Sequence, residues 1–138
     1  MDIWHVENMH WAKLILWRTD EDTFRVAQDG EYNPLLTNGN YILVNKKYAD
    51  IFRQLHGQVA VREVKIVDFE FNTQNNDYVE LLIANEIDPD SIKVKDSEWA
   101  KIWRCEGYVF VTGSLKEALA SISNSELHFN LGFSHFCG

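Results

Sequence analysis

Two stretches of the chain, residues 40–55 and 107–122, show the same order of features. In each, a Tyr and three large apolar residues precede a short polar break, after which apolar residues recur at helical spacing. A helix that lies on a sheet buries an apolar face of both elements, so a strand, a helix and a second strand form a stable unit. The repetition therefore predicts an α+β fold: a single domain with a mostly antiparallel or mixed sheet and two main helices in a repeated strand-helix-strand unit.

In the first stretch, the apolar residues 41–44 predict a strand. Asn45 is of a residue type that caps helix N-termini, and the residues after it predict a helix over 46–56. Gly57 stands where a helix commonly ends in a left-handed residue. One face of this helix would carry residues spaced i, i+3, i+4 and i+7: Tyr48, Ile51, Phe52 and Leu55.

The second stretch predicts a strand over 108–111 and a helix over 115–122, with Thr112 or Ser114 as the N-cap. The apolar face of this helix matches that of the first position for position: Leu115, Ala118, Leu119 and Ile122. Duplication of one ancestral unit would explain the match. Independent use of favourable local sequence would explain it as well.

Outside the repeat, apolar patterning predicts strands over 13–18, 59–71, 78–87, 99–107 and 126–133. The alternation of polar and apolar residues shifts by one position midway through 59–71, which indicates a bulge or two successive strands. We expect this run and 78–87 to form an antiparallel hairpin with a turn at 72–77. An acidic turn is expected at 19–24, and the turn-forming residues of 29–40 predict a loop.

Composition limits the class of protein. With 138 residues, 46% of them apolar, and two prolines, the chain fits one packed domain. Cys105 and Cys137 are too few for a disulfide framework and lack the spacing of a zinc or redox pair, so we expect free thiols. The first residues do not show a secretory signal, and no apolar run reaches the length of a membrane span. These features predict a soluble, cytoplasmic protein.

The net charge of −8 is unevenly distributed. Residues 63–98 carry ten acidic side chains against three lysines, a balance of −7. The acidic residues are Glu63, Asp68, Glu70, Asp77, Glu80, Glu86, Asp88, Asp90, Asp96 and Glu98. Such a field repels nucleic-acid phosphates and attracts a basic partner. The alternative is a solvated acidic surface that only keeps the protein in solution.

The sequence lacks the common motifs of catalysis. His5, Glu7 and His10 lie close together, but the paired cysteines of a zinc deaminase and the order His-Glu-x-x-His are missing. His135 and Cys137 could form a four-ligand site with the N-terminal histidines only if the fold brought the two segments together, and nothing in the sequence requires this. There is no Gly-x-Ser-x-Gly nucleophile motif and no glycine-rich phosphate loop. We therefore expect no enzyme, no cofactor and no metal, although a carboxylate pair for acid–base catalysis would leave no sequence signature.

Two of the five tryptophans, Trp99 and Trp103, directly follow an acidic stretch. Most tryptophans in a domain of this size belong to the core. Trp beside carboxylates is nevertheless typical of a protein-binding hot spot. The sequence thus predicts a partner-binding surface made of Glu86, Asp88, Asp90, Asp96, Glu98, Trp99 and Trp103.

Residues 36–129 resemble a known family. The features are an Ile-Leu-Val strand before a helix that contains Ala49, a Y-x-x-L-x-x-x-x-x-I-D stretch that ends at Asp88, and the run Phe-Val-Thr followed by Leu-Lys-Glu-Ala-Leu. In these it is similar to the immunity-protein domain of bacterial polymorphic toxin systems, in particular the family numbered eleven and its uncharacterised relatives. Residues 5–18 have no counterpart in that pattern.

The resemblance implies a non-enzymatic antidote in the cytoplasm of the bacterium that makes the toxin. It would bind its cognate toxin domain and block the active site or the substrate path. The family pattern assigns no binding residues, so none is carried over. A compact acidic domain suits a basic, nuclease-like toxin. The alternatives are an acidic interaction or adaptor module unrelated to toxins and, less in keeping with the residues, a small enzyme whose site has no sequence signature.

Overall fold

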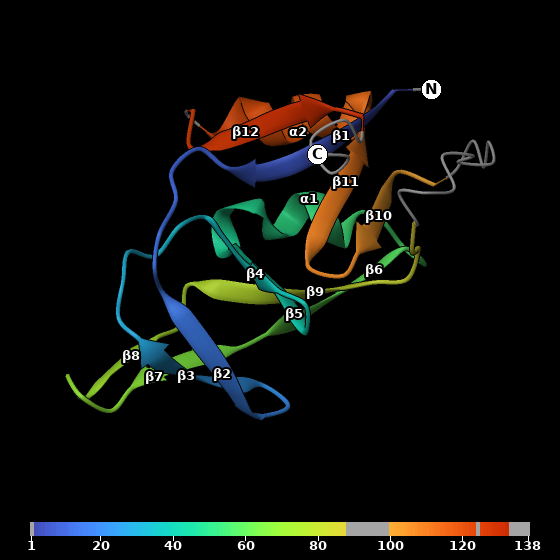
Figure 1. Cartoon of the computed structure of the whole chain (residues 1–138). Helices are drawn as coiled ribbons and strands as arrows, with labels where there is room; N and C mark the ends of the chain where they lie inside the picture. Colours follow the sequence, from blue (N-terminus) through green and yellow to red (C-terminus); the bar gives the residue numbers. More distant parts are fainter. Residues whose placement is uncertain (1, 88–99, 124, 133–138) are drawn as a thin grey trace.

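The computed structural model describes residues 2–87, 100–123 and 125–132. Within these ranges the chain forms twelve strands in three four-stranded sheets, and two α-helices (Figure 1). Strand pairing is antiparallel except between β3 and β7. The predicted α+β class with a mostly antiparallel or mixed arrangement and two helices is therefore confirmed, but the strands divide among three sheets.

The upper sheet of Figure 1 contains both ends of the described chain. Its strands, in order across the sheet, are β10 (Ile102–Cys105), β11 (Tyr108–Thr112), β1 (Ile3–Asn8) and β12 (Leu127–Leu131). Helix α2 (Gly113–Ser123) connects β11 to β12. Leu115 and Leu119 on α2 are buried, as the helical spacing predicted. The predicted strand and helix of the second stretch are confirmed, and the predicted strand 99–107 is present over the residues of β10.

The central sheet carries the first stretch. Its strands, in order, are β4 (Leu35–Asn38), β5 (Tyr41–Asn45), β9 (Tyr78–Ile83) and β6 (Val59–Glu63). The predicted helix 46–56 is shorter than expected: a 3-10 turn, η1 (Lys46–Tyr48), leads into α1 (Ala49–Arg53). The Asn45 side chain accepts a hydrogen bond from the Lys47 backbone N–H at 3.0 Å, which confirms the predicted cap. Gly57 has the expected positive φ, +80°.

The lower sheet is formed by two hairpins. Its strands, in order, are β2 (Ile15–Asp20), β3 (Thr23–Gln28), β7 (Lys65–Asp68) and β8 (Thr73–Asn75). The long run 59–71 is divided at the buried Val64, so β6 belongs to the central sheet and β7 to the lower one. This confirms the alternative of two successive strands. β9 pairs antiparallel with β6, as expected.

Three predicted connections are wrong in part. Of residues 19–24, expected as an acidic turn, Glu21 and Asp22 lie between β2 and β3, and the others belong to these strands. Residues 72–77, expected as a turn, include β8, which pairs with β7 although its three residues are polar. Residues 29–40, expected as a loop, include β4, which pairs with β5. In β4 the apolar pair Leu35 and Leu36 is buried, and this burial outweighs the turn-forming residues around it.

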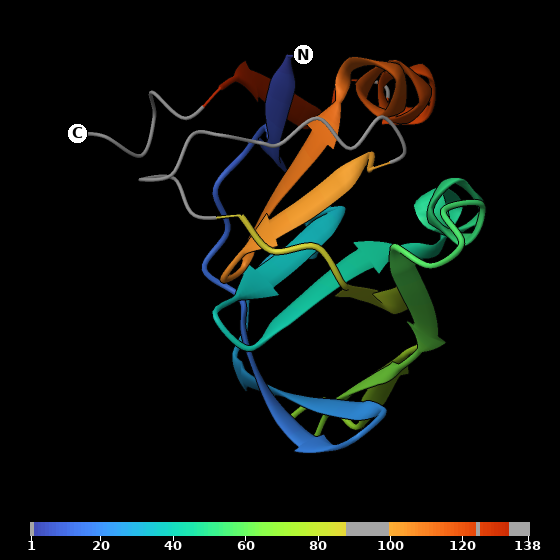
Figure 2. The ribbon, with the colours of Figure 1, turned by 90° about the vertical axis from the view of Figure 1, so that its right-hand side faces the viewer.

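The central sheet lies between the other two, and Figures 1 and 2 show the three layers from two sides. One of its faces packs Ile42 and Val44 into a core shared with α1, α2 and the upper sheet. The opposite face packs Tyr41, Leu43 and Tyr78 against the lower sheet. Sheets covered on both faces have nearly continuous apolar strands, which explains why β5 and β9 read as apolar runs. Both helices lie on the same side of the molecule in Figure 2.

Candidate interaction surfaces

The structure describes two members of the predicted partner-binding surface. Glu86 and Trp103 lie within the described ranges, whereas Asp88, Asp90, Asp96, Glu98 and Trp99 lie outside the described residues. The geometry of the predicted surface is therefore known at Glu86 and Trp103.

Glu86 is held at the surface by its backbone. It forms a parallel bridge with Arg104, and the flanking hydrogen bonds run from Ile87 N to Arg104 O at 2.9 Å and from Arg104 N to Asn85 O at 2.8 Å. The Glu86 side chain is 76% exposed, and its carboxylate lies 3.8 Å from the Arg104 Nε. An exposed ion pair of this kind adds little stability. Glu86 thus has a backbone position fixed by hydrogen bonds and an exposed carboxylate that a partner can reach.

Trp103 is buried on β10. Its residue is 6% exposed and packs with Ile3, Ala100 and Phe110. The structure therefore does not bring Trp103 to the surface beside Glu86. In this conformation the Trp103 ring belongs to the core, the ordinary place for Trp in a domain of this size.

Glu80 does not belong to the acidic surface. It lies on β9 in the central sheet, is 2% exposed, and faces two arginines from neighbouring strands. Arg18 of β2 donates a hydrogen bond to its carboxylate, and the Arg62 Nη1 lies 3.6 Å from its Oε1. A buried carboxylate needs such partners because transfer out of water is costly. One of the ten charges counted in 63–98 is therefore neutralised in the interior.

The histidines singled out in the sequence are separated. His5 is buried on β1 with its ring centroid 5.4 Å from that of Phe110, whereas His10 is exposed in the β1–β2 connection. His135 and Cys137 lie outside the described residues. Among the residues that the structure describes, no group of three or more His, Cys, Asp or Glu side chains could hold a metal ion.

A carboxylate at the start of β12 joins the two helical regions. The Tyr48 hydroxyl donates a hydrogen bond to Glu126 at 2.5 Å, and Lys47 forms an ion pair with the same carboxylate. Burial, together with the neighbouring carboxylate, raises the pKa of Tyr48. Burial also acts to raise the pKa of Glu126, but the hydrogen bonds from Lys47 and Tyr48 outweigh it, so this pKa lies below its ordinary value.

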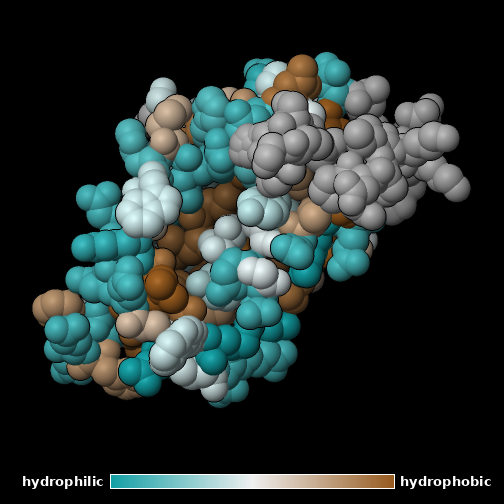
Figure 3. Space-filling model, in the orientation of Figure 1, coloured by the Kyte–Doolittle hydropathy of each residue, from teal (hydrophilic) through white to brown (hydrophobic). Residues whose placement is uncertain are grey.

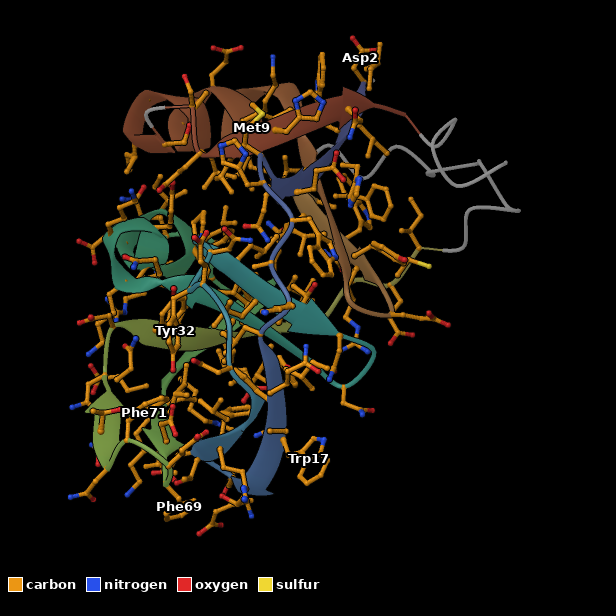
Figure 4. The ribbon with its side chains drawn as sticks, turned by 60° about the vertical axis from the view of Figure 1, so that its left-hand side comes forward. Asp2, Met9, Trp17, Tyr32, Phe69 and Phe71 are labelled. Carbon is orange, nitrogen blue, oxygen red and sulfur yellow. The ribbon has the colours of Figure 1, made fainter. Side chains whose placement is uncertain are left out.

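The outer face of the lower sheet, which sequence reasoning missed, gathers exposed aromatic residues around an arginine. Trp17 pairs with Arg25 across β2 and β3, and Arg25 pairs with Val67 across β3 and β7, so the three share one face. Trp17 is 61% exposed and Phe69, just after β7, is 70% exposed. Figure 4 shows both rings at the lower end of the molecule. We call Trp17, Arg25 and Phe69 the aromatic-arginine surface.

Arg25 lies between the two rings. Its guanidinium carbon is 5.9 Å from the Trp17 ring centroid and 5.3 Å from the Phe69 ring centroid, within reach of cation–π attraction. The Arg25 Nε is enclosed and has no hydrogen-bond partner. Within the described ranges Arg25 forms no ion pair, in contrast to Arg18 and Arg62. Arg25 is therefore a cation beside two aromatic rings whose charge is not matched by a carboxylate within the part of the chain that the structure describes.

The outward positions of this sheet include one carboxylate, Asp20, which pairs with Thr23 and accepts a hydrogen bond from the Glu21 backbone N–H at 2.8 Å. Strand alternation and register place these residues on the same face: Ile15, Trp17, Thr23, Arg25, Lys65, Val67 and Gln74. The Asp68 carboxylate is used within its own turn, where it accepts a hydrogen bond from the Glu70 backbone N–H at 3.0 Å. The outward strand positions thus carry two cations, Arg25 and Lys65, against the Asp20 carboxylate, on a chain with net charge −8.

A cleft of about 490 Å³ separates the β1–β2 connection from the edge of the central sheet. Met9, Trp11, Leu35 and Leu36 are among its lining residues. It opens on the face drawn in Figure 3, where hydrophobic atoms show at the bottom of a hollow. Glu7, His10 and Glu31 add polar groups to the lining, so the cleft is mixed in character.

Comparison of the chain with protein-family models, with curated proteins and with solved structures gave no match. Among the described residues, no helix has the length and apolar character needed to cross a membrane.

Proposed function

We propose that the chain is a non-enzymatic immunity protein that binds and neutralises a cognate bacterial toxin domain in the cytoplasm. The observation that carries the proposal is the concentration of charge: residues 63–98 hold −7 of the net −8. The resemblance of residues 36–129 to immunity-protein domains gives this charge a biological role. The protein would need no cofactor and no metal for such a role, because inhibition by binding requires only a complementary surface.

The charge available to a partner is concentrated in the connection from β9 to β10. It includes Glu86, Asp88, Asp90, Asp96 and Glu98 against Lys93 and Lys95. The exposed Glu86 carboxylate begins this segment at a position fixed by hydrogen bonds to Arg104. A basic toxin, such as a nuclease, would be attracted to it, and like-charged molecules would be repelled. The acidic segment would then occupy the site where the toxin holds a phosphate backbone.

The proposal is tested by growth rescue. The gene beside that of the chain is expressed from an inducible plasmid in a bacterial host, with and without the chain. We expect growth arrest that the wild-type chain relieves. A variant with Asp88→Asn, Asp90→Asn, Asp96→Asn and Glu98→Gln should relieve it less and bind the toxin with a slower, less salt-dependent association rate.

A matched variant neutralises four acidic residues on other surfaces: Asp2→Asn, Glu31→Gln, Asp50→Asn and Glu117→Gln. It makes the same change in net charge, and we expect it to rescue growth as the wild type does. Arrest that the wild-type chain fails to relieve would overturn the proposal. Equal loss in both variants would refute the role of the β9–β10 connection and leave only a dependence on net charge.

We also propose that the strand-helix-strand unit is repeated. In support, the upper and central sheets share one arrangement, in which β5 and β6 flank β9 as β11 and β12 flank β1. In each, a helix joins the two flanking strands. If the units are equivalent, residues 46–56 can be replaced by residues 113–123 with cooperative unfolding retained. Loss of the cooperative transition in that chimaera would contradict the repeat.

A further inference from the structure

We propose that the aromatic-arginine surface is a second docking site, which binds a protein segment carrying a carboxylate beside a large apolar side chain. The inference does not depend on the proposed function, because it rests on the lower sheet alone. Trp17, Arg25 and Phe69 come from β2, β3 and the end of β7, and both rings lie within about 6 Å of the Arg25 guanidinium on one exposed face.

The composition is that of a binding hot spot. Trp and Arg are enriched among the residues that carry most of the energy of protein interfaces, and aromatic rings are enriched there in general. Trp17 and Phe69 expose 61% and 70% of their area, and the neighbouring Ile15 is also exposed. Such rings are ordinarily buried in a stable domain. Covering them would remove apolar area from water at a site that already has its final shape.

The site is preorganised by the opposite face of the same sheet. Leu16, Phe24 and Ile66 are buried against the central sheet, which fixes β2, β3 and β7. Arg25 is held between the two rings. A binding group that is already ordered loses less conformational entropy when a partner arrives. The lower sheet therefore presents Arg25 in one orientation rather than as a freely moving side chain.

The charge of the occupant follows from the charge of Arg25. A guanidinium prefers a carboxylate or phosphate partner, bound by parallel hydrogen bonds. Arg18 and Arg62 of the same region find theirs in Glu80. Within the described ranges Arg25 has none, and its enclosed Nε lacks a hydrogen-bond partner. An incoming carboxylate would supply the missing negative charge.

A protein segment fits this surface better than a nucleic acid. Stacking platforms for single strands combine aromatic rings with a positively charged groove that follows the backbone. Here the outward strand positions offer two cations, Arg25 and Lys65, with the Asp20 carboxylate on the same face, which is too few positive charges to follow a row of phosphates. One carboxylate with one or two apolar side chains matches the number of groups present.

The test uses a phage-displayed library of random linear peptides, selected on the immobilised full chain and counter-selected on its Arg25→Gln variant. We expect the recovered peptides to be enriched in Asp or Glu next to Trp, Phe or Leu. A synthetic peptide of the recovered sequence should bind the Trp17→Ala, Phe69→Ala and Arg25→Gln variants about tenfold more weakly than the wild type, the loss expected for a hot-spot residue.

Matched controls are Trp11→Ala and Arg53→Gln, which change an exposed Trp and an exposed Arg elsewhere. They should leave the peptide affinity unchanged, and circular dichroism should show all variants folded. Four results would overturn the proposal: no recovered peptide, recovered peptides that are basic or uncharged, equal weakening in the controls, or displacement of the peptide by oligodeoxythymidine. None of them would bear on toxin neutralisation, which uses other residues.

Discussion

The two faces of the lower sheet use the same kinds of residue in different ways. On the inner face, Arg18 lies over the Phe24 ring at 4.6 Å and donates a hydrogen bond to the buried Glu80. On the outer face, Arg25 lies near the Trp17 and Phe69 rings and forms no ion pair with a carboxylate of the described residues. The inner Phe24 is fully buried, whereas the outer rings are exposed. An arginine over an aromatic ring is therefore present on both faces, and its surroundings decide what it does.

Burial and pairing distinguish a structural residue from a binding residue. Inside, each apolar ring adds to the free energy of folding, and removing one partner of the ion pair leaves a charge without compensation. Outside, the same groups contribute little to folding because water already solvates them in both states. Substitutions that are matched across the sheet should separate the two roles.

The largest difference is expected between two Phe→Ala substitutions. Phe24→Ala removes a fully buried ring and should lower the free energy of unfolding by about 4 kcal/mol. Phe69→Ala removes a ring that is 70% exposed and should change it by about 0.5 kcal/mol or less. Urea denaturation followed by circular dichroism measures both values. Similar losses in the two variants would remove the distinction between the faces.

The next difference concerns the two arginines. Arg18→Met leaves the buried Glu80 with Arg62 as its ion-pair partner among the described residues, and should lower the free energy of unfolding by about 2 kcal/mol. Arg25→Met leaves no buried carboxylate behind and should cost about 0.5 kcal/mol or less. The measurement is again urea denaturation.

A double variant checks the cause. If the loss in Arg18→Met comes from an uncompensated Glu80, then Glu80→Leu in the same chain should restore part of the stability, and the two substitutions should not be additive. Additive losses would mean that Arg18 stabilises the sheet through its packing over Phe24 instead.

The smallest effect is expected at Glu126, a partly exposed carboxylate outside the lower sheet. Its pKa in the folded protein lies below the ordinary value of 4.5, so its contribution is fully present above pH 4.5 and is lost as the pH falls through the lower, folded value. Glu126→Gln should therefore lose less stability than the wild type between pH 7 and acid. Because solvent screens this group, the difference should be small. Identical pH profiles from urea denaturation would show that the contact with Lys47 and Tyr48 is without effect.

Much of the fold could be predicted because its signals are local. The strand over 41–44, the Asn45 cap and the change in the alternation of polar and apolar residues in 59–71 are all visible in short segments. Each is present in the structure. The strand β8 could not be predicted, since its three residues are polar and its partner β7 alone makes it a strand. The burial of Glu80 was hidden for a related reason, because Arg18 and Arg62 reach it from distant positions in the chain.

The aromatic-arginine surface had no local signal either. Alternation around the buried Leu16 places Trp17 outward, but the parallel pairing of β3 with β7 brings Phe69 to Arg25 across 44 positions of sequence. The Trp103 position shows the converse. Its acidic neighbourhood in the sequence suggested a surface, whereas the structure packs it with Ile3 and Phe110. Sequence proximity to charge does not report on which face of a strand a ring will lie.

The most direct test of this division between the two faces is to measure folding and binding on the same pair of variants, Arg18→Met and Arg25→Met. Urea denaturation gives the stability of each, and calorimetric titration with the selected acidic peptide gives the affinity. We expect Arg25→Met to keep its stability and lose about tenfold in affinity, and Arg18→Met to lose stability and keep its affinity. An Arg25→Met variant that unfolds more easily but binds the peptide as the wild type does would contradict the account.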